Sequence, residues 1–234
     1  MGACGDDIGR HRAPATENLS AVEKFGAMLK ILGKTSSINV RKVLWLCAEM
    51  ALKFEHVQWG EGFRTTDTLE FKALNPNALV PVLRDGSVVL WESNTICRYL
   101  AHRYLRPDLL PTDARGRARV EQWMDWQATE LNDSWQYAFM ALVRKSPQHG
   151  NSKATDDSVR SWNRNMEILD GQLSKTRAYV AGDSFTLADI VIGLSVSRWF
   201  LAPIARANLP AVYAYYERLS TRPAFRMYGR NGPP

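Results

Sequence analysis

The sequence predicts an α/β N-terminal domain followed by an all-α C-terminal domain, on the strength of three patterns. From Met28 onward, short apolar strands flank one helical pattern, as in a crossover unit with a parallel strand pair. An Asp85–Gly86 turn then joins two short strands, as in a β-hairpin. After a linker marked by Pro107 and Pro111, the apolar residues recur only at helical spacing, so the rest of the chain is expected to be helical.

The N-terminal domain is expected over residues 28–106 and the helical domain over residues 112–230. The strands and helices expected in the first domain follow in chain order: strands 29–32 and 54–59, a helix around 40–48 between them, hairpin strands 80–84 and 88–91, and a helix 93–104. In the second domain one apolar face is expected to run from Val120 to Leu142, and further helices are expected at 159–173, 187–200 and 209–220.

Composition sets the broad class of the protein. The chain has 234 residues, of which 45% are hydrophobic and 23% charged, as in ordinary globular proteins. No run of about 18 apolar residues predicts a membrane span. The formal net charge is +6, but lysine and arginine are scattered, so no nucleic-acid surface is expected. This charge suits small anionic ligands.

Cys4, Cys47 and Cys97 are the three cysteines of the chain. Their odd number and spacing argue against a disulfide framework and against a metal site of the zinc type. Cys47 and Cys97 lie on apolar helix faces, where buried, unreactive thiols are expected. A reducing, cytoplasmic location follows as an expectation.

Residues 1–27 differ from the rest of the chain. They contain no apolar core of a secretory signal and no periodic apolar pattern. We expect a disordered extension, with a natural start at Met28 as the alternative.

A proline interrupts an apolar strand at Val80-Pro81. Proline removes a ladder donor, so it is expected at a sheet edge or after a cis bond. A cis bond would turn the N–H and C=O of Val80 outward, where they could pair with an extended peptide. An ordinary trans proline in an edge strand is the alternative.

Glu92 and Ser93 stand where the next helical pattern begins. Ser93 is expected to be the N-cap residue, and the helix N-terminus behind it suits a carboxylate. Glu92 could accept an ammonium group. The pair therefore fits a ligand that carries both groups on one carbon, and a plain helix cap is the alternative.

Hydroxyl-bearing residues fill the loop before the first helix, in the run TSSIN from Thr35 to Asn39. Their hydroxyls could cap the helix or donate a hydrogen bond to a thiolate held at its N-terminus. A turn at Asn75-Pro76-Asn77 leads toward Val80-Pro81.

Taken together, these segments resemble the N-terminal domain of the glutathione S-transferases, which has a thioredoxin-like fold. The resemblance rests on Ser36-Ser37 and Asn39, the run LNPNALVPVL from Leu74 to Leu83, and Glu92-Ser93. The run YVAGDSFTLAD from Tyr179 to Asp189 resembles the C-terminal signature of the family and has the spacing of a capping box. The resemblance is closest to bacterial enzymes of the serine type, which are similar to the theta and beta groups.

The resemblance implies that glutathione is the co-substrate and that Ser37, or else Ser36, activates its thiol, with Asn39 orienting the serine or the ligand. Leu79, Val80, Pro81, Glu92 and Ser93 would hold the tripeptide. No tyrosine lies in the first strand–helix unit and no cysteine lies in its loop, so neither of the family's other catalytic residues has a counterpart here. Many relatives carry a lysine where this chain has Leu79, which puts the partner of the glycyl carboxylate in doubt.

The implied activity is conjugation of glutathione to a small hydrophobic electrophile, a detoxification reaction, by a homodimer. The electrophile would bind between the domains, where Trp126, Trp135, Tyr137 and Trp199 are candidate wall residues, although core packing is expected for at least half of them. A glutathione-dependent isomerase or disulfide reductase, and a non-catalytic regulatory protein that binds glutathione, are the alternatives.

Overall fold

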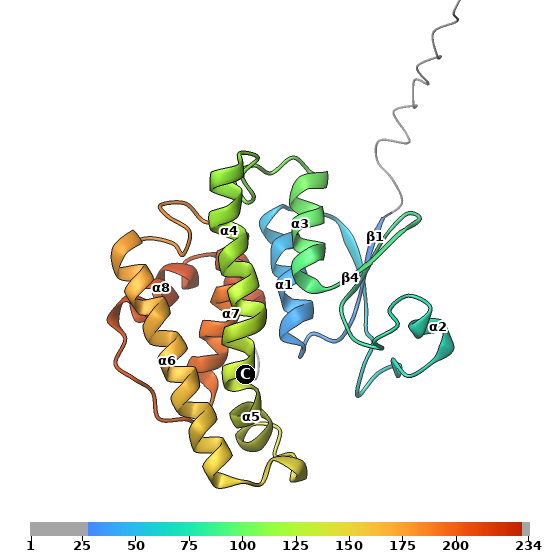
Figure 1. Ribbon diagram of the computed structural model, residues 1–234. Helices are drawn as coiled ribbons and strands as arrows, with labels where there is room; N and C mark the ends of the chain where they lie inside the picture. Colours follow the sequence, from blue (N-terminus) through green and yellow to red (C-terminus); the bar gives the residue numbers. More distant parts are fainter. Residues whose placement is uncertain (1–27, 231–234) are drawn as a thin grey trace, which may run out of the picture.

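A mixed four-stranded sheet forms the first part of the computed structural model, which describes residues 28–230 (Figure 1). Residues 1–27, for which a disordered extension is predicted, lie outside the described residues, as do residues 231–234. The strand order is β2-β1-β3-β4. Strand β1 pairs in parallel with β2 and antiparallel with β3, which forms a hairpin with β4. The elements of this part are β1 (Leu29–Leu32), α1 (Ile38–Glu49), β2 (Phe54–Val57), α2 (Leu69–Lys72), β3 (Val82–Asp85), β4 (Val88–Trp91) and α3 (Ser93–Arg103).

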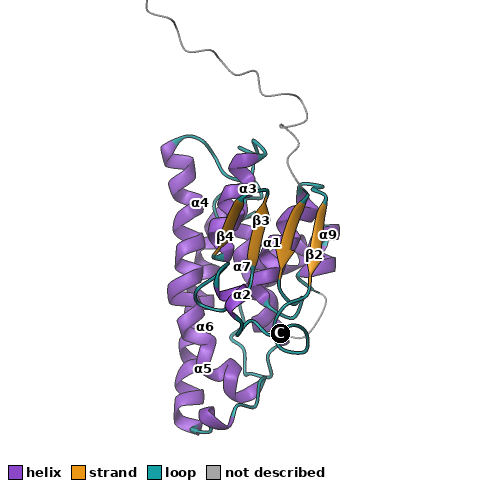
Figure 2. Ribbon diagram, turned by 90° about the vertical axis from the view of Figure 1, so that its right-hand side faces the viewer, coloured by secondary structure: helices purple, strands orange, loops and turns teal. Residues whose placement is uncertain are grey.

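Helices α1 and α3 lie between the sheet and the helical part of the molecule, whereas α2 lies on the other side of the sheet (Figures 1 and 2). Helix α1 is therefore covered on two sides. Val40, Trp45 and Leu46 are completely buried in it, although they point in different directions around the helix. Burial all round α1 places its N-terminal end at the junction between the two parts.

The second part of the chain is helical, as predicted. Its central helix is α7, which is buried over nearly its whole length. The capping box expected at Thr186 and Asp189 is present: the Asp189 carboxylate accepts the Thr186 N–H at 2.8 Å, the Val180 N–H at 2.9 Å and the Tyr215 hydroxyl at 3.0 Å. The helices of this part are α4 (Ala114–Trp126), α5 (Asn132–Leu142), α6 (Ser152–Thr176), α7 (Leu187–Leu201), α8 (Pro210–Ser220) and α9 (Pro223–Tyr228).

The single apolar face expected from Val120 to Leu142 is interrupted. A π-helical turn, η1 (Gln127–Leu131), separates α4 from α5. This prediction was wrong because the π-turn accommodates an extra residue without changing the local composition, so no breaker residue marks it. The short helices α2 and α9 were also missed, since four and six residues are too few for a periodic pattern.

Two strand boundaries differ from the expectation. Strand β2 ends at Val57 rather than at Trp59, because Trp59 instead forms an isolated bridge with Arg64. Strand β3 begins at Val82, immediately after the Val80–Pro81 bond. None of the helices in the described part of the chain is long and apolar enough to span a membrane.

Candidate functional site

Three segments singled out in the sequence meet at one end of α1. Gly33, in the loop before α1, packs so closely against Val80 that a Cβ atom on Gly33 would lie 3.0 Å from the Val80 Cβ. Its φ of +147° also favours glycine. On the other side, the Ser93 hydroxyl donates a hydrogen bond of 3.4 Å to Asn39 Oδ1. The structure thus brings together the hydroxyl-rich loop, Val80-Pro81 and the start of α3.

Ser37 occupies the N-cap position of α1, but its side chain forms no capping hydrogen bond. Its backbone N–H donates to the Lys34 carbonyl and its carbonyl accepts the Arg41 N–H, both at 3.0 Å. Ser36 lies in the preceding turn, and both serines are half-buried. The Ser37 hydroxyl is therefore available to a group placed at the helix N-terminus, where the free N–H groups favour negative charge.

The peptide bond between Val80 and Pro81 is cis, which decides between the two alternatives that the sequence left open. The N–H and C=O of Val80 take part in no backbone hydrogen bond within residues 28–230. The side chain of Leu79 is 65% exposed, while its carbonyl accepts a 2.7 Å hydrogen bond from Asn75. Val80 thus offers a peptide edge, whereas Leu79 offers no charged group.

The start of α3 differs in one detail from the prediction. Glu92 is the N-cap residue, and Ser93 is the first residue of the helix. Ser93 does not cap, because its side chain is buried and directed toward Asn39. Glu92 is exposed and has a φ of +69°. The exposed carboxylate of Glu92 can still bind a cation, and the first N–H groups of α3 beside it can still bind an anion, as the sequence analysis expected.

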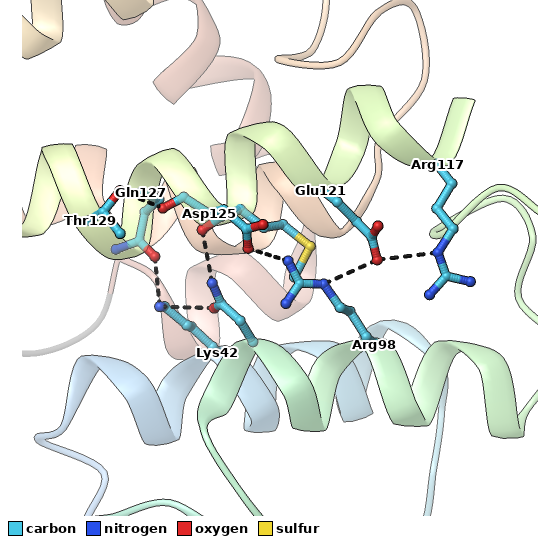
Figure 3. A network of polar contacts seen from close by, with 9 residues as sticks. Lys42, Arg98, Arg117, Glu121, Asp125, Gln127 and Thr129 are labelled. Atoms are coloured by element: carbon cyan, nitrogen blue, oxygen red, sulfur yellow. Dashed lines mark hydrogen bonds and ion pairs between the residues drawn. The ribbon is translucent and has the colours of Figure 1, made fainter. Parts of the chain in front are cut away.

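Lys42 is a buried lysine behind this site, and the sequence analysis did not identify it (Figure 3). Its ammonium donates hydrogen bonds of 3.2 Å to Asn94 Oδ1 and 2.7 Å to Gln127 Oε1. Asn94 in turn donates to the Met124 carbonyl at 2.9 Å, and Gln127 donates to Ser195 at 3.1 Å. Lys42 therefore connects α1 and α3 with the π-turn and, through it, with α7.

Burial lowers the pKa of Lys42 to about 8; nearby Cys97 and Glu92 oppose this shift, while Arg198 adds to it. A second set of contacts runs beside it in Figure 3, where Arg98 of α3 forms ion pairs with Glu121 and Asp125 of α4. The N-terminus of α3, which carries Glu92 and Ser93, is thereby held against the helical part.

The four aromatic residues proposed as walls of the electrophile site lie in different surroundings in the structure. Trp135 is buried with its ring under the guanidinium of Arg198, which lies 4.5 Å from the ring centroid. Trp199 is a fully buried core residue, and Tyr137 packs against His149. Trp126 lines an outer hollow of about 270 Å³ with Trp123, Gln122 and Ile168. Of the four candidates, Trp135 is the one placed beside a buried charge.

The buried cations Arg41, Lys42 and Arg198 were missed by the sequence analysis. For Arg198 a signal existed, since it stands inside the apolar run of the predicted helix 187–200. Arg41 and Lys42 are buried because their side of α1 packs against the helical part of the molecule.

Cys47 and Cys97 are free, buried thiols, as expected. Burial raises the pKa of both thiols, to about 12 for Cys97. Neither is therefore ionised near neutral pH. No group of three or more His, Cys, Asp and Glu side chains within residues 28–230 is arranged to hold a metal ion.

Comparison with known proteins places this arrangement in one family. Residues 36–103 match the profile of the glutathione S-transferase N-terminal domain, and residues 134–223 match that of the C-terminal domain. Glutathione S-transferase GstB of Escherichia coli is 35% identical over 201 residues, which cover 85% of this chain and 96% of that protein. Glutathione S-transferase 3 of Zea mays is 32% identical over 86% of this chain and 92% of that protein.

Solved structures agree with this assignment. The theta class glutathione S-transferase from Xanthomonas axonopodis pv. citri with glutathione bound superposes with a TM-score of 0.81 at 35% identity, covering 87% of this chain and 98% of that one. Glutathione transferase F7 from Populus trichocarpa has a TM-score of 0.76 at 29% identity, over 88% and 100% of the two chains. The chain belongs to the glutathione S-transferase family.

Proposed function

We propose that this protein conjugates glutathione to an electrophilic carbon, and that Ser37 activates the thiol. The observation that carries the proposal is the position of the Ser37 hydroxyl. It lies at the N-terminus of α1 and is not used for capping. Family membership supports the same activity.

The chemistry requires a thiolate. A free thiol of this kind has a pKa of roughly 8.5, so it is mostly protonated at neutral pH. Lowering that pKa by about 2 units corresponds to roughly 2.7 kcal/mol of thiolate stabilisation. A hydrogen bond from Ser37 and the N-terminal end of α1 are suited to supply it. The thiolate then attacks the carbon, a carbon–sulfur bond forms, and the leaving group departs with its electron pair.

The remaining site residues would hold the tripeptide. Val80 precedes the cis bond to Pro81, and its N–H and C=O form no backbone hydrogen bond among the described residues. They can therefore pair with the backbone of the cysteinyl residue of glutathione. The γ-glutamyl end fits at the start of α3, with its carboxylate at the helix N-terminus near Ser93 and its ammonium near Glu92. Asn39 links the two halves through its contact with Ser93. Leu79 brings no partner for the glycyl carboxylate.

The proposal extends to the setting of the enzyme. We propose a division into a glutathione domain over residues 28–106 and a helical domain over residues 112–230, a homodimer, and a cytoplasmic, detoxifying role. The apolar hollow formed by the half-buried Trp123 and Trp126 with the exposed Ile168 supports association of two copies, because aromatic residues are enriched at interfaces.

A glutathione-affinity measurement combined with a conjugation assay on a panel of small electrophiles tests the function. We expect binding of glutathione and catalysed loss of its free thiol with at least one electrophile. Binding without conjugation would favour the regulatory alternative. Activity with disulfide or isomerisable substrates, and none with alkyl or aryl halides, would favour the isomerase or reductase.

A further inference from the structure

Arg198 is a buried cation with an incomplete set of hydrogen bonds. It lies near the end of α7, and only 4% of its surface is exposed. The Nε atom of its side chain is buried and has no hydrogen-bond partner within residues 28–230. The guanidinium carbon lies 4.5 Å from the Trp135 ring centroid and 4.2 Å from that of Phe139. Ring faces stabilise a cation but do not accept its N–H hydrogen bonds as an oxygen does.

A second donor without an acceptor lies beside it. The indole Nε1 of Trp135 is also buried and unpartnered among the described residues. Burying a hydrogen-bond donor without an acceptor is unfavourable. Because two such donors lie side by side here, we infer that one acceptor binds to both. An acceptor that suits a guanidinium and an indole N–H is an oxyanion, because both groups only donate.

Positive charge continues from this point to the surface. Arg41 and Arg144 are close enough to Arg198 that both lower its pKa, after the larger effect of burial, to about 9. The exposed Arg144 also lies over Phe139, with 5.4 Å between its guanidinium carbon and the ring centroid. Among the described residues, no carboxylate is a cause of the shifted pKa of Arg198. The three arginines come from α1, from the segment just after α5 and from α7, so these elements bring three positive charges together in one cluster.

Arg41 links this cluster to the proposed thiolate site. Arg41 follows Ser37 by about one helical turn, and its backbone N–H donates a hydrogen bond to the Ser37 carbonyl. On the other side, Glu61 interacts with Arg144 and is hydrogen-bonded to Lys34, three residues before Ser37.

We propose that the electrophile of this enzyme carries a carboxylate, which binds to Arg198 and the Trp135 N–H while the thiolate attacks a carbon elsewhere in the same molecule. The inference rests on the proposed transferase function and specifies its substrate class. In the test reaction the glutathione thiolate displaces chloride from a benzylic carbon: the carbon–sulfur bond forms, the carbon–chlorine bond breaks, and chloride leaves with the electron pair. The carboxylate is unchanged.

The kinetic experiment compares 4-(chloromethyl)benzoate with 4-(chloromethyl)benzamide, each corrected for the uncatalysed reaction. We expect kcat/KM to favour the carboxylate by about 10- to 100-fold, as for one well-placed charged contact. Arg198→Met should abolish the preference, and Trp135→Phe, which keeps an aromatic ring face but removes the indole N–H, should reduce it. Arg160→Met on the exposed face of α6 makes the same change in net charge and should leave the preference intact.

A binding experiment separates this inference from the proposed function. Calorimetry with S-(4-carboxybenzyl)glutathione and S-(4-carbamoylbenzyl)glutathione needs no turnover. Suppose that the carboxybenzyl conjugate binds more tightly than the carbamoylbenzyl conjugate, that this difference depends on Arg198, and that neither chloromethyl compound is turned over. This result would support the anion site and reject the transferase function. Equal binding of the two conjugates to the parent would overturn the anion site.

Two controls complete the test. Arg198→Met must bind the carbamoyl conjugate within about twofold of the parent, which shows that it folds; if it does not fold, Trp135→Phe decides the outcome. If Arg198→Met weakens binding of free glutathione as much as that of the carboxybenzyl conjugate, Arg198 serves the tripeptide, and the proposal is wrong.

Discussion

The Nζ atom of Lys42 lies 2.7 Å from Oε1 of Gln127, so an ammonium in α1 donates a hydrogen bond to the π-turn between α4 and α5. Asn94, at the start of α3, accepts a second bond from the same ammonium. One fully buried charge thus holds three elements in a fixed relation. Because α1 carries Ser37 and α3 follows Glu92, Lys42 also fixes the two ends of the proposed glutathione site relative to each other.

Lys42 gives the protein a characteristic dependence of stability on pH. Burial lowers the pKa of Lys42 in the folded protein to about 8, from 10.5 in the unfolded chain. Between these values the unfolded chain binds more protons than the folded one, so the free energy of unfolding rises with pH. At roughly 1.4 kcal/mol per pH unit the gain is about 3 kcal/mol. We expect it in chemical denaturation of the parent from pH 8 to 10.5.

The matched variant for this prediction is Lys42→Met, which removes the titrating group and keeps an unbranched side chain. Subtracting its stability at each pH cancels the tyrosines and other groups that titrate in both proteins. If the two stability curves run parallel between pH 8 and 10.5, Lys42 remains protonated in the folded state and the network is held by a charged lysine throughout.

Ser37→Ala tests the proposed thiol activation. Removing one hydrogen bond to a thiolate should lower kcat/KM by about 10- to 100-fold and raise the apparent pKa of bound glutathione. Ser36→Ala is the control, because Ser36 lies one residue earlier in the same loop. Spectroscopic titration of the bound thiolate and steady-state kinetics measure the two effects. A crippled Ser36→Ala with an unaffected Ser37→Ala would transfer the role to Ser36.

Glu92→Gln and Ser93→Ala test the γ-glutamyl site. Each should weaken glutathione binding by about 1–3 kcal/mol in calorimetry, with little change in thermal unfolding. Ser93→Ala also removes the contact with Asn39, so its effect includes the position of that amide. Thr95→Ala, an exposed position in the first turn of α3, is the control and should bind normally. Two variants that bind like the parent would rule out this site.

The pair Glu49–Arg222 should stabilise the junction of α1 and α9. Arg222 forms hydrogen bonds of 2.9 and 2.7 Å with the two carboxylate oxygens of Glu49 and lies over Phe185. Glu49→Gln should lower the free energy of unfolding by about 1–3 kcal/mol in urea denaturation. Asp157→Asn, in an exposed pair on α6, should change it by less than about 0.5 kcal/mol. Equal effects would mean that the partial burial of the Glu49–Arg222 pair adds nothing to its contribution.

The sequence predicted most of the fold because the local patterns agreed with the tertiary structure. Strand β1, the hairpin around Asp85–Gly86 and the capping box at Thr186 and Asp189 each depend on neighbouring residues, and all are present. Site residues that lie in short motifs, such as Val80-Pro81, could likewise be identified, although the pattern was equally compatible with a trans bond.

The features that the sequence could not predict arise where the α/β part packs against the helical part. Arg41 and Lys42 have the spacing of a polar helix face, and they become buried only because the helical part covers that face. The unpaired donors of Arg198 and Trp135 are likewise a property of three packed helices. Glu92 replaced Ser93 as the cap because Ser93 is turned toward Asn39, a contact between positions 54 residues apart.

The π-turn at Gln127–Leu131 has a mechanical consequence. Each residue of an α-helix advances the side-chain direction by about 100°, so the extra residue of the π-turn sets the rotational phase of α5 relative to α4. Gln127 faces Lys42 at its start, and Trp135 and Phe139 face Arg198 beyond it. Deleting one residue there would restore a regular helix and rotate both rings away while the composition stayed almost unchanged. A one-residue difference in the length of this turn would therefore remove the proposed carboxylate site while leaving the proposed thiolate site on α1 in place.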